Sequence, residues 1–314
     1  MMQITAVLVE PSARGHVVLS NVEAPAARPG EALVRVHATS LNRGEIRGAG
    51  QGAPGRRIGW DFAGVVERAA DDVPGPAAGT RVVGMLRTGA WAELIAAPVE
   101  ALAVLPAGVD FARAATLPVA GLTALYGLDR AHGLLGRKVL ITGGTGGVGH
   151  FGIQLARLGG AQVVATVRRQ EQSKLVRDAG AHEVVLGDDK KTIHAAGPFD
   201  HVLDGVGGNT LAGALASLAR NGSAVIYGAT GGAEVPFDAR AFYPTAGASL
   251  YGFILFHELL SNPAGIGLAR LARLLEDGRL RAPIAVEGKL AEIGDLAQRL
   301  EDRAFTGKAV VHFL

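Results

Sequence analysis

The fold of this chain is decided by the stretch Lys138-Val139-Leu140-Ile141-Thr142-Gly143-Gly144-Thr145-Gly146-Gly147-Val148-Gly149. Lys138–Thr142 has the character of a short apolar strand, and the glycines after it open a helix expected over Gly149–Gly159. In this context a Gly-x-Gly-x-x-Gly pattern indicates a dinucleotide-binding turn, because its glycines permit a tight turn, a close approach of backbone to a pyrophosphate, and helix–strand packing. The helix N-terminus then offers free N–H groups and a partial positive charge to the phosphates. A glycine-rich turn without a ligand is the alternative.

Strands and helices alternate after this turn. The expected strands are Gln162–Val167, Glu183–Leu186, Asp200–Asp204 and Ser223–Tyr227, and the expected helices include Gln170–Ala179 and Thr210–Ala219. This alternation predicts an α/β fold in which helices cover both faces of a doubly wound parallel sheet.

The end of the second strand distinguishes the possible cofactors. A protein that binds NAD places an acidic residue about 20 residues after the turn, where it binds the ribose 2′-hydroxyl. Here the strand reaches Thr166 and ends in Arg168 and Arg169, with no acid at its tip, and Lys174 comes shortly after. Since a guanidinium donates in a planar fork that suits phosphate, this pattern favours NADPH. Ordinary solvated arginines are the alternative.

The N-terminal third consists of short β-rich runs between Gly/Pro turns. The expected strands there are Ala6–Val9, Val17–Leu19, Ala32–Ala38, Gly64–Arg68, Arg81–Met85 and Trp91–Ala96. Towards the end of the chain we expect a strand over Ser249–Phe256, a helix over Gly267–Glu276 and a strand over Lys308–Phe313.

Composition narrows the function further. The 314 residues are 48% hydrophobic and 19% charged, with a net charge of +2, and no basic block is interleaved with aromatic residues, so nucleic-acid binding is not expected. There is no cysteine and the nine histidines are scattered, so no metal site is expected. The start of the chain lacks the pattern of a signal peptide, and Leu117–Leu128 falls short of the roughly 20 residues of a membrane helix. We expect a cytoplasmic protein that does not associate with a membrane.

Several segments together resemble one family along nearly the whole chain. In order, they are Leu41-Asn42-Arg43-Gly44-Glu45, Gly59-Trp60-Asp61-Phe62-Ala63-Gly64-Val65-Val66, Ala115-Thr116-Leu117-Pro118-Val119-Ala120-Gly121-Leu122-Thr123-Ala124, the glycine turn, Asp204-Gly205-Val206-Gly207-Gly208, and Thr306-Gly307-Lys308-Ala309-Val310-Val311. They resemble the zinc-free medium-chain dehydrogenases/reductases of the quinone oxidoreductase type. Zinc alcohol dehydrogenases of the same superfamily have Gly-His-Glu where this chain has Gly59-Trp60-Asp61, and they have a catalytic cysteine, which is missing here.

The resemblance implies a β-rich, GroES-like catalytic domain over residues 1–118, a Rossmann domain that binds NADP(H) over residues 119–258, and a return to the catalytic domain over residues 259–314. It also implies hydride transfer from NADPH, without zinc, to a quinone or to a C=C bond next to a carbonyl group. An enoyl-thioester reductase is the second enzymatic hypothesis. A non-catalytic NADPH-binding sensor or partner protein is the third.

The resemblance also implies roles for individual residues. Residues expected to contact the cofactor are Thr123, Gly144, Thr145, Gly146, Gly147, Val148, Thr166, Arg168, Arg169, Lys174, Gly228, Phe253, Ile254 and Lys308. Asn42 is expected to make polar contacts with the substrate, although capping of a loop is its alternative role. Glu45 and Asp61 are expected to be structural.

The segment after Asn42 departs from the family. Relatives often have a tyrosine there, whereas Glu45–Gln51 has none and reads as a shortened loop. The proton for the reaction then comes from solvent, or Arg47 orients an acceptor oxygen. Tyr126, Tyr243 and Tyr251 remain alternatives that core packing also explains. Finally, the resemblance implies a homodimer that pairs through the strand Ser249–Phe256, which would otherwise leave an apolar edge exposed.

Overall fold

The computed structural model describes residues 2–187 and 189–313, and the chain divides into two compact units. Unit 1 combines Met1–Leu122 with Leu259–Leu314, and unit 2 is Thr123–Glu258. The sequence placed the first boundary after Pro118, which in the structure lies inside the π-helical turn η3 (Leu117–Gly121) of unit 1. The chain enters unit 2 through the helix α3 (Leu122–Asp129).

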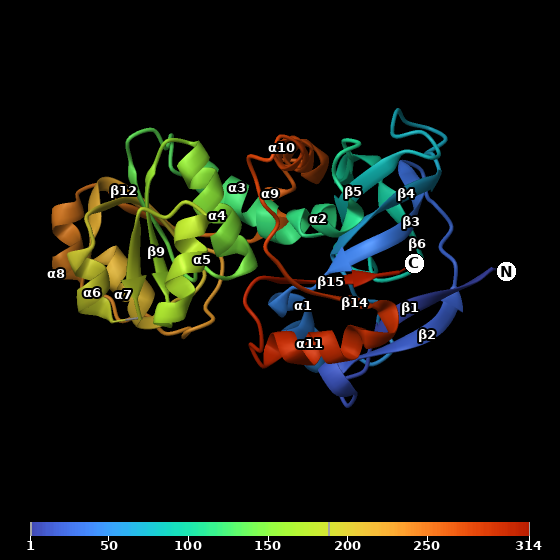
Figure 1. Ribbon diagram of the computed structural model, residues 1–314, viewed down its shortest axis with the longest axis horizontal. Coiled ribbons are helices and arrows are strands. Elements are labelled where there is room, and N and C mark those ends of the chain that lie inside the picture. Colours follow the sequence, from blue (N-terminus) through green and yellow to red (C-terminus); the bar gives the residue numbers. More distant parts are fainter. Residues whose placement is uncertain (1, 188, 314) are drawn as a thin grey trace. The chain divides into compact units, whose positions relative to one another are not determined.

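Unit 1 is built on a seven-stranded sheet in the order β14-β15-β3-β4-β5-β7, with β6 paired to β3, and on a separate two-stranded sheet of β1 and β2. The strands are β1 (Gln3–Val9), β2 (Val17–Glu23), β3 (Glu31–Ser40), β4 (Asp61–Arg68), β5 (Arg81–Met85), β6 (Leu94–Pro98), β7 (Leu102–Val104), β14 (Ile284–Lys289) and β15 (Lys308–His312). Figure 1 shows β15 beside β3, which it joins in antiparallel pairing. The C-terminal segment therefore completes the N-terminal sheet.

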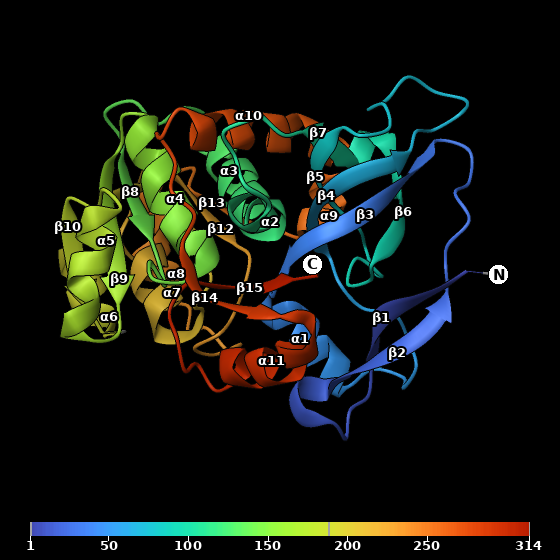
Figure 2. The same ribbon diagram turned by 45° about the vertical axis from the view of Figure 1, so that its right-hand side comes forward.

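The helices of unit 1 come from both ends of its sequence. They are α1 (Arg43–Gly50), α2 (Phe111–Ala115), α10 (Ala264–Glu276) and α11 (Ile293–Glu301), with short 3₁₀ turns η1 (Arg14–His16), η2 (Val99–Ala101) and η6 (Leu290–Glu292). Figure 2 shows α11 beside α1, and the two helices are in contact. Buried side chains of α11, Leu296 and Leu300 among them, join the same hydrophobic core as Val34 and Trp91.

Unit 2 is a six-stranded parallel sheet in the order β10-β9-β8-β11-β12-β13. Its strands are β8 (Lys138–Ile141), β9 (Gln162–Val167), β10 (Glu183–Leu186), β11 (Phe199–Asp204), β12 (Leu218–Ile226) and β13 (Ser249–Gly252). The helices are α4 (Gly147–Leu158), α5 (Ser173–Asp178), α6 (Lys190–Ala195), α7 (Gly208–Leu215), α8 (Ala239–Phe242) and α9 (Leu255–Glu258), with η4 (Gln170–Gln172) and η5 (Tyr243–Thr245). The predicted doubly wound parallel sheet is confirmed.

The strand order fixes where a ligand belongs in unit 2. Consecutive strands run outward from β8 to β10 on one side and from β11 to β13 on the other, so the order reverses between β8 and β11. In sheets of this kind the ligand crevice lies outside the carboxyl ends of the strands at that reversal. The glycine turn comes directly after β8, and the segment Gly205–Gly208 comes directly after β11.

Three expectations about elements are wrong. The strand expected over Ser249–Phe256 ends at Gly252, and the helix α9 begins at Leu255. The helix expected over Thr210–Ala219 ends at Leu215, because Leu218 already starts β12. The expected loop Glu45–Gln51 is mostly the helix α1, which begins with a hydrogen bond from the Asn42 backbone N–H to the Glu45 carboxylate.

Candidate functional site

The glycine turn of unit 2 forms a cradle at the start of α4. Gly146 precedes the helix in extended conformation (φ −77°, ψ 167°), and its carbonyl accepts the N–H of His150 at 2.8 Å. The N–H groups of Gly147, Val148 and Gly149 belong to the first turn, where a helix has no partners of its own for them. Gly146 is exposed, and Thr145, Gly147 and Val148 are half-buried. The turn therefore fits a pyrophosphate.

Gly149 and Gly146 differ in how much room their surroundings leave for a side chain. A Cβ at Gly149 would lie 2.3 Å from the Gly143 carbonyl oxygen, so the helix could not pack on the turn with any larger residue. A Cβ at Gly146 would meet only that same oxygen, at 3.4 Å, which is ordinary contact. The fold therefore requires glycine at position 149. At position 146 the fold would accept a side chain, but glycine leaves the exposed side of the turn open to a ligand.

Buried hydroxyl and carboxylate groups hold the turn in place. The Gly143 N–H donates to Thr166 Oγ1 at 3.0 Å, so Thr166 supports the turn from beneath. Thr142 Oγ1 donates to Asp204 Oδ1 at 2.7 Å, and Asp204 Oδ2 accepts the N–H of Gly207 at 2.8 Å. Burial raises the pKa of Asp204, against the effect of these hydrogen bonds. The glycine segments after β8 and β11 are thereby joined.

The arginine segment after β9 lies on the surface of unit 2. Arg168, Arg169 and Lys174 are all exposed. Arg169 Nε is 2.9 Å from Glu171 Oε1, and Lys174 Nζ is 2.6 Å from Asp178 Oδ2. Exposed ion pairs of this kind contribute about 0–1 kcal/mol, so exchanging them for a phosphate costs little. The segment fits a second, charged group of a dinucleotide.

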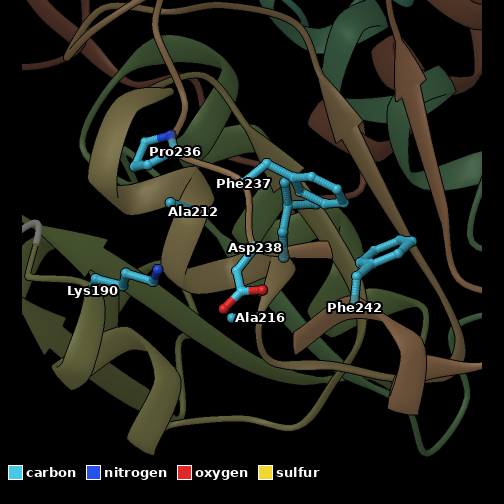
Figure 3. Close-up of a pocket in the computed structure, with 8 residues that line it drawn as sticks. Lys190, Ala212, Ala216, Pro236, Phe237, Asp238 and Phe242 are labelled. Atoms are coloured by element: carbon cyan, nitrogen blue, oxygen red, sulfur yellow. The ribbon is translucent and has the colours of Figure 1, made fainter. Parts of the chain in front are cut away.

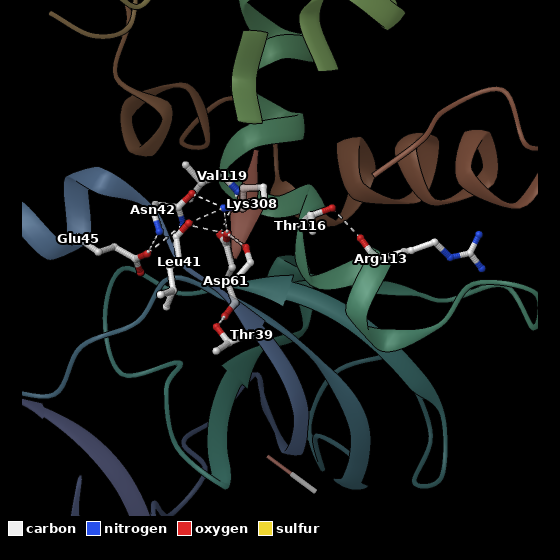
Figure 4. Close-up of polar contacts among 10 residues, drawn as sticks. Thr39, Leu41, Asn42, Glu45, Asp61, Arg113, Thr116, Val119 and Lys308 are labelled. Carbon is white, nitrogen blue, oxygen red and sulfur yellow. Dashed lines mark hydrogen bonds and ion pairs between the residues drawn. The ribbon is translucent and has the colours of Figure 1, made fainter. Parts of the chain in front are cut away.

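A buried polar cluster in unit 1 gathers four segments that are far apart in the sequence (Figure 4). Lys308 Nζ donates to Leu41 O at 2.9 Å, to Asn42 Oδ1 at 2.6 Å and to Asp61 Oδ2 at 3.3 Å. Asp61 Oδ1 accepts the N–H of Val119 at 3.0 Å. Because an ammonium group has three protons, these contacts use all of the Lys308 donors. We call Ser40, Asn42, Glu45, Asp61, Val119 and Lys308 the Asp61 cluster.

The cluster fixes the orientation of the Asn42 amide. Asn42 Nδ2 donates to Glu45 Oε2 at 2.9 Å and to Asp61 Oδ2 at 2.8 Å, while Oδ1 faces the Lys308 ammonium. Both N–H protons of this amide are used inside the protein. Asn42 can therefore only accept a hydrogen bond from a substrate. Lys308, for which the family resemblance implies a contact with the cofactor, is a buried side chain that is only 3% exposed.

Burial has a strong effect on Glu45 in this cluster. Burial, followed by the nearby Asp61 carboxylate, raises the pKa of Glu45 well above its usual value, while Asn42 and Lys308 act in the opposite direction. The buried Lys308 ammonium therefore offsets part of the cost of burying these acidic side chains.

The other predicted site residues are on several different elements. Arg47 is exposed on α1, and Thr123 is buried at the start of unit 2. Gly228 comes after β12, while Phe253 and Ile254 come after β13, so all three are at carboxyl ends of parallel strands. Ile254 is exposed and Phe253 is buried.

A small pocket on unit 2 is distinct from the glycine turn. It is lined by Lys190, Leu215, Phe237, Asp238 and Phe242, with neighbouring residues, and has about 240 Å³ of empty volume (Figure 3). Because that volume includes space open to solvent, the pocket is too small for a dinucleotide. None of the predicted cofactor residues lines it.

Comparisons with known proteins agree with both units. A model of the alcohol dehydrogenase GroES-like domain matches residues 28–107, and a model of zinc-binding dehydrogenases matches residues 147–264. A mycobacterial quinone oxidoreductase structure has a TM-score of 0.88 and 27% identity, covering 99% of this chain and 100% of its own. The chain belongs to the medium-chain dehydrogenase/reductase family. Within this family it is quinone oxidoreductase-like.

Further relatives of this dehydrogenase/reductase differ in size. A mycobacterial protein solved in complex with NADPH matches with a TM-score of 0.88 and 27% identity, over 99% of this chain and 100% of its own. A mycocerosic acid synthase-like polyketide synthase of Mycobacterium tuberculosis is 31% identical over 90% of this chain, which spans only 14% of that protein. The 2-methylene-furan-3-one reductase of Solanum lycopersicum is 28% identical over 93% of this chain and 74% of its own.

The described part of the chain has neither a cluster of metal-ligating side chains nor a helix suited to span a membrane. Among residues 2–187 and 189–313, no group of three or more His, Cys, Asp or Glu side chains could hold a metal ion. Within the same ranges, no helix combines the length and apolar character that crossing a bilayer requires.

Sequence reasoning singled out the turn and the arginines but missed the residues that support them. Thr142 and Asp204 contact each other across 62 positions of the chain, whereas Gln172 accepts from the nearby Arg168 and Arg169. Gln172 alone carried a local signal, because Gln at the third position of a helical turn commonly hydrogen-bonds back to the residue before that turn.

Proposed function

We propose that this protein is an NADPH-dependent, zinc-independent reductase that delivers a hydride to a quinone or to a C=C bond conjugated with a carbonyl group. The glycine turn Gly143–Gly149 and the acid-free, arginine-bearing end of β9 carry the proposal. The relative solved with NADPH adds support. When bound, NADPH supplies the hydride, and the protein contributes binding, orientation and exclusion of water.

The cofactor would be held by unit 2. Backbone N–H groups of Gly147 and Val148, at the helix N-terminus, would bind the pyrophosphate together with the turn residues Gly144, Thr145 and Gly146. Arg168 and Arg169 would bind the 2′-phosphate through their guanidinium forks, with Lys174 adding a point charge. The rest of the cofactor would contact Thr123, Gly228, Phe253 and Ile254.

The acceptor side of the proposal does not need a metal ion. Where zinc-dependent relatives have Gly-His-Glu, this chain has Gly59-Trp60-Asp61, and the Asp61 carboxylate is occupied by Ser40, Asn42, Val119 and Lys308. We assign Arg47, exposed on α1, as the side chain that orients the acceptor oxygen. Asn42, whose two amide protons are used by Glu45 and Asp61, would contact only a donor group of the substrate. A proton from solvent then completes the reduction.

An enoyl thioester is the second candidate substrate, and the matches to polyketide synthases favour it. A thioester and an enone both present a C=C bond next to a carbonyl group, so the same hydride addition at the β-carbon reduces either. They differ in the group attached to the far side of the carbonyl carbon, and the catalytic groups proposed here do not distinguish them.

The test is a steady-state screen of NADPH oxidation over quinones, enals, enones and crotonyl-type thioesters, with NADH in parallel. We expect turnover with at least one conjugated acceptor and a lower KM for NADPH than for NADH. Tight binding of NADPH without turnover on any acceptor would instead support a sensor. No binding of either dinucleotide would eliminate the proposal.

We also propose a homodimer that pairs through β13. This strand ends the sheet order, and within the described residues no strand covers its outer edge. Leu250 on β13 is 50% exposed, and Phe237 and Tyr243 are exposed as well. A second copy of β13 would complete the unpaired backbone groups and cover apolar surface.

A further inference from the structure

The backbone of the arginine segment is held by one buried side chain. Gln172 Oε1 accepts the N–H of Arg168 at 3.2 Å and the N–H of Arg169 at 3.2 Å. The backbone N–H of Gln172 donates in turn to the Arg169 carbonyl oxygen at 3.1 Å. Gln172 is 6% exposed, whereas both arginines are exposed. Because two N–H groups converge on this position, the amide must present its oxygen to them.

The direction of each arginine therefore depends on Gln172. Beyond its Cβ, an exposed arginine side chain is flexible, and the Arg169–Glu171 pair is exposed at both ends. What remains fixed is the Cα–Cβ direction, which the backbone sets. Three contacts between Gln172 and the arginine backbone lock that segment as it leaves β9.

The chemical type of this side chain matters as much as its geometry. A glutamate could accept the same two N–H groups, and it would accept them more strongly because it is charged. It would also bring a negative charge beside the segment on which a 2′-phosphate would bind. Glutamine satisfies the backbone while remaining neutral, so the arginines stay the dominant charges there.

We propose that Gln172 is a positioning residue for cofactor preference: its neutral amide orients Arg168 and Arg169 towards the 2′-phosphate of NADPH without repelling that phosphate. This inference rests on the proposed use of NADPH. It predicts that hydrogen bonding and charge at position 172 can be separated by substitution, since Gln172→Glu keeps the acceptor and adds a charge, while Gln172→Ala removes the acceptor.

The experiment measures dissociation constants for NADPH and NADH by calorimetry on the full chain, together with melting temperatures. The variants are Gln172→Glu, Gln172→Ala and the control Gln170→Ala, which alters an exposed glutamine of the same turn. For Gln172→Glu we expect an unchanged melting temperature, about tenfold weaker NADPH binding and unchanged NADH binding. For Gln172→Ala we expect NADPH binding to weaken by about three- to tenfold, with NADH again unchanged. Gln170→Ala should match the wild type.

The outcomes separate this inference from the proposed function. If the wild type prefers NADPH and both Gln172 variants keep that preference, the positioning role is overturned and the cofactor assignment stands. Equal weakening of both dinucleotides would indicate a purely structural role and would also overturn it. A wild type without preference for NADPH overturns the cofactor assignment, and the role of Gln172 falls with it.

Discussion

Asn42 shows how the sequence can single out a residue while missing its partners in the fold. Its neighbours in the sequence indicate a turn with a cap, and Glu45 does cap α1. Its strongest partner, however, is Lys308, which is 266 positions away. Local patterns contain no information on such a pair. Only folding of β15 beside β3 brings the two together.

Replacement of Lys308 tests the Asp61 cluster. Lys308→Met keeps most of the volume but leaves the Asp61 carboxylate buried without its cation, so we expect a loss of about 3–5 kcal/mol in the free energy of unfolding. Urea unfolding measures the change. Lys289→Met, at an exposed lysine of β14, is the control and should cost less than about 0.5 kcal/mol. Equal effects of the two changes would contradict the buried network.

Replacement of Gly146 tests the cradle without disturbing the fold. Its backbone is in a region open to alanine, and an added Cβ meets only ordinary contact, so Gly146→Ala should keep the wild-type melting temperature. The methyl group would stand where the pyrophosphate approaches. We expect NADPH binding to weaken by about 100-fold, equivalent to two lost hydrogen bonds to a charged group. Fluorescence titration measures it, with Gly48→Ala on α1 as the control. Undiminished affinity of Gly146→Ala would remove the turn from the binding site.

At the scale of elements, the sequence predicted best where apolar runs are bounded by glycines or charges. β5, β9 and β10 have the expected bounds, because each is a short run with consecutive valines and clear ends. The run Ser249–Phe256 was overextended because an apolar segment does not reveal where a strand changes into a helix. β7 and β14 were missed, since they are short or only half-buried and depend on their neighbours for pairing.

The strand β11 carries a histidine that should make unit 2 sensitive to acid. His201 is buried, with Nδ1 2.7 Å from Ser223 Oγ, and burial lowers its pKa to about 4 from the ordinary 6.5. The unfolded chain therefore binds a proton more readily between these two values. Stability should be complete above pH 6.5 and should fall as the pH decreases towards 4, by on the order of 3 kcal/mol for this residue.

The variant His201→Asn can keep a hydrogen bond to Ser223 but cannot titrate. We expect the slope of unfolding free energy against pH, between pH 6.5 and 4.5, to decrease by about one proton relative to the wild type. His194→Asn is the matched control, because exposed His194 also has a serine partner, Ser217, at 2.9 Å. An unaltered slope in His201→Asn, or an equal decrease in both variants, would show that burial of His201 is not the cause.

At the scale of the whole molecule, the return of the chain to its first unit came from family resemblance and not from local pattern. α11 has an ordinary amphipathic sequence and β15 a short, almost fully buried one, and such sequences fit many folds. Their place in unit 1 is set by pairing with β3 and by shared core contacts, which connect residues near opposite ends of the chain. Long-range pairing of this kind is what short sequence windows cannot determine.

The proposed dimer is tested at its edge strand. Leu250→Lys places a charge on the apolar edge of β13, and we expect dimer affinity to fall at least about tenfold because the charge would be buried between copies. Sedimentation equilibrium measures the change. Ile266→Lys, at an exposed apolar residue of α10, is the control and should leave the dimer intact. A wild-type monomer at all concentrations would eliminate the proposal.

The proposed function requires that NADPH delivers a hydride to a conjugated acceptor. The most direct measurement uses NADPH that carries deuterium at the transferred position of the nicotinamide ring, an enone or a crotonyl-type thioester as acceptor, and mass spectrometry of the product. We expect a saturated product with one deuterium at the carbon β to the carbonyl group, and little or none with deuterated NADH at equal concentration. A saturated product without deuterium, or no consumption of NADPH with any conjugated acceptor, would contradict it.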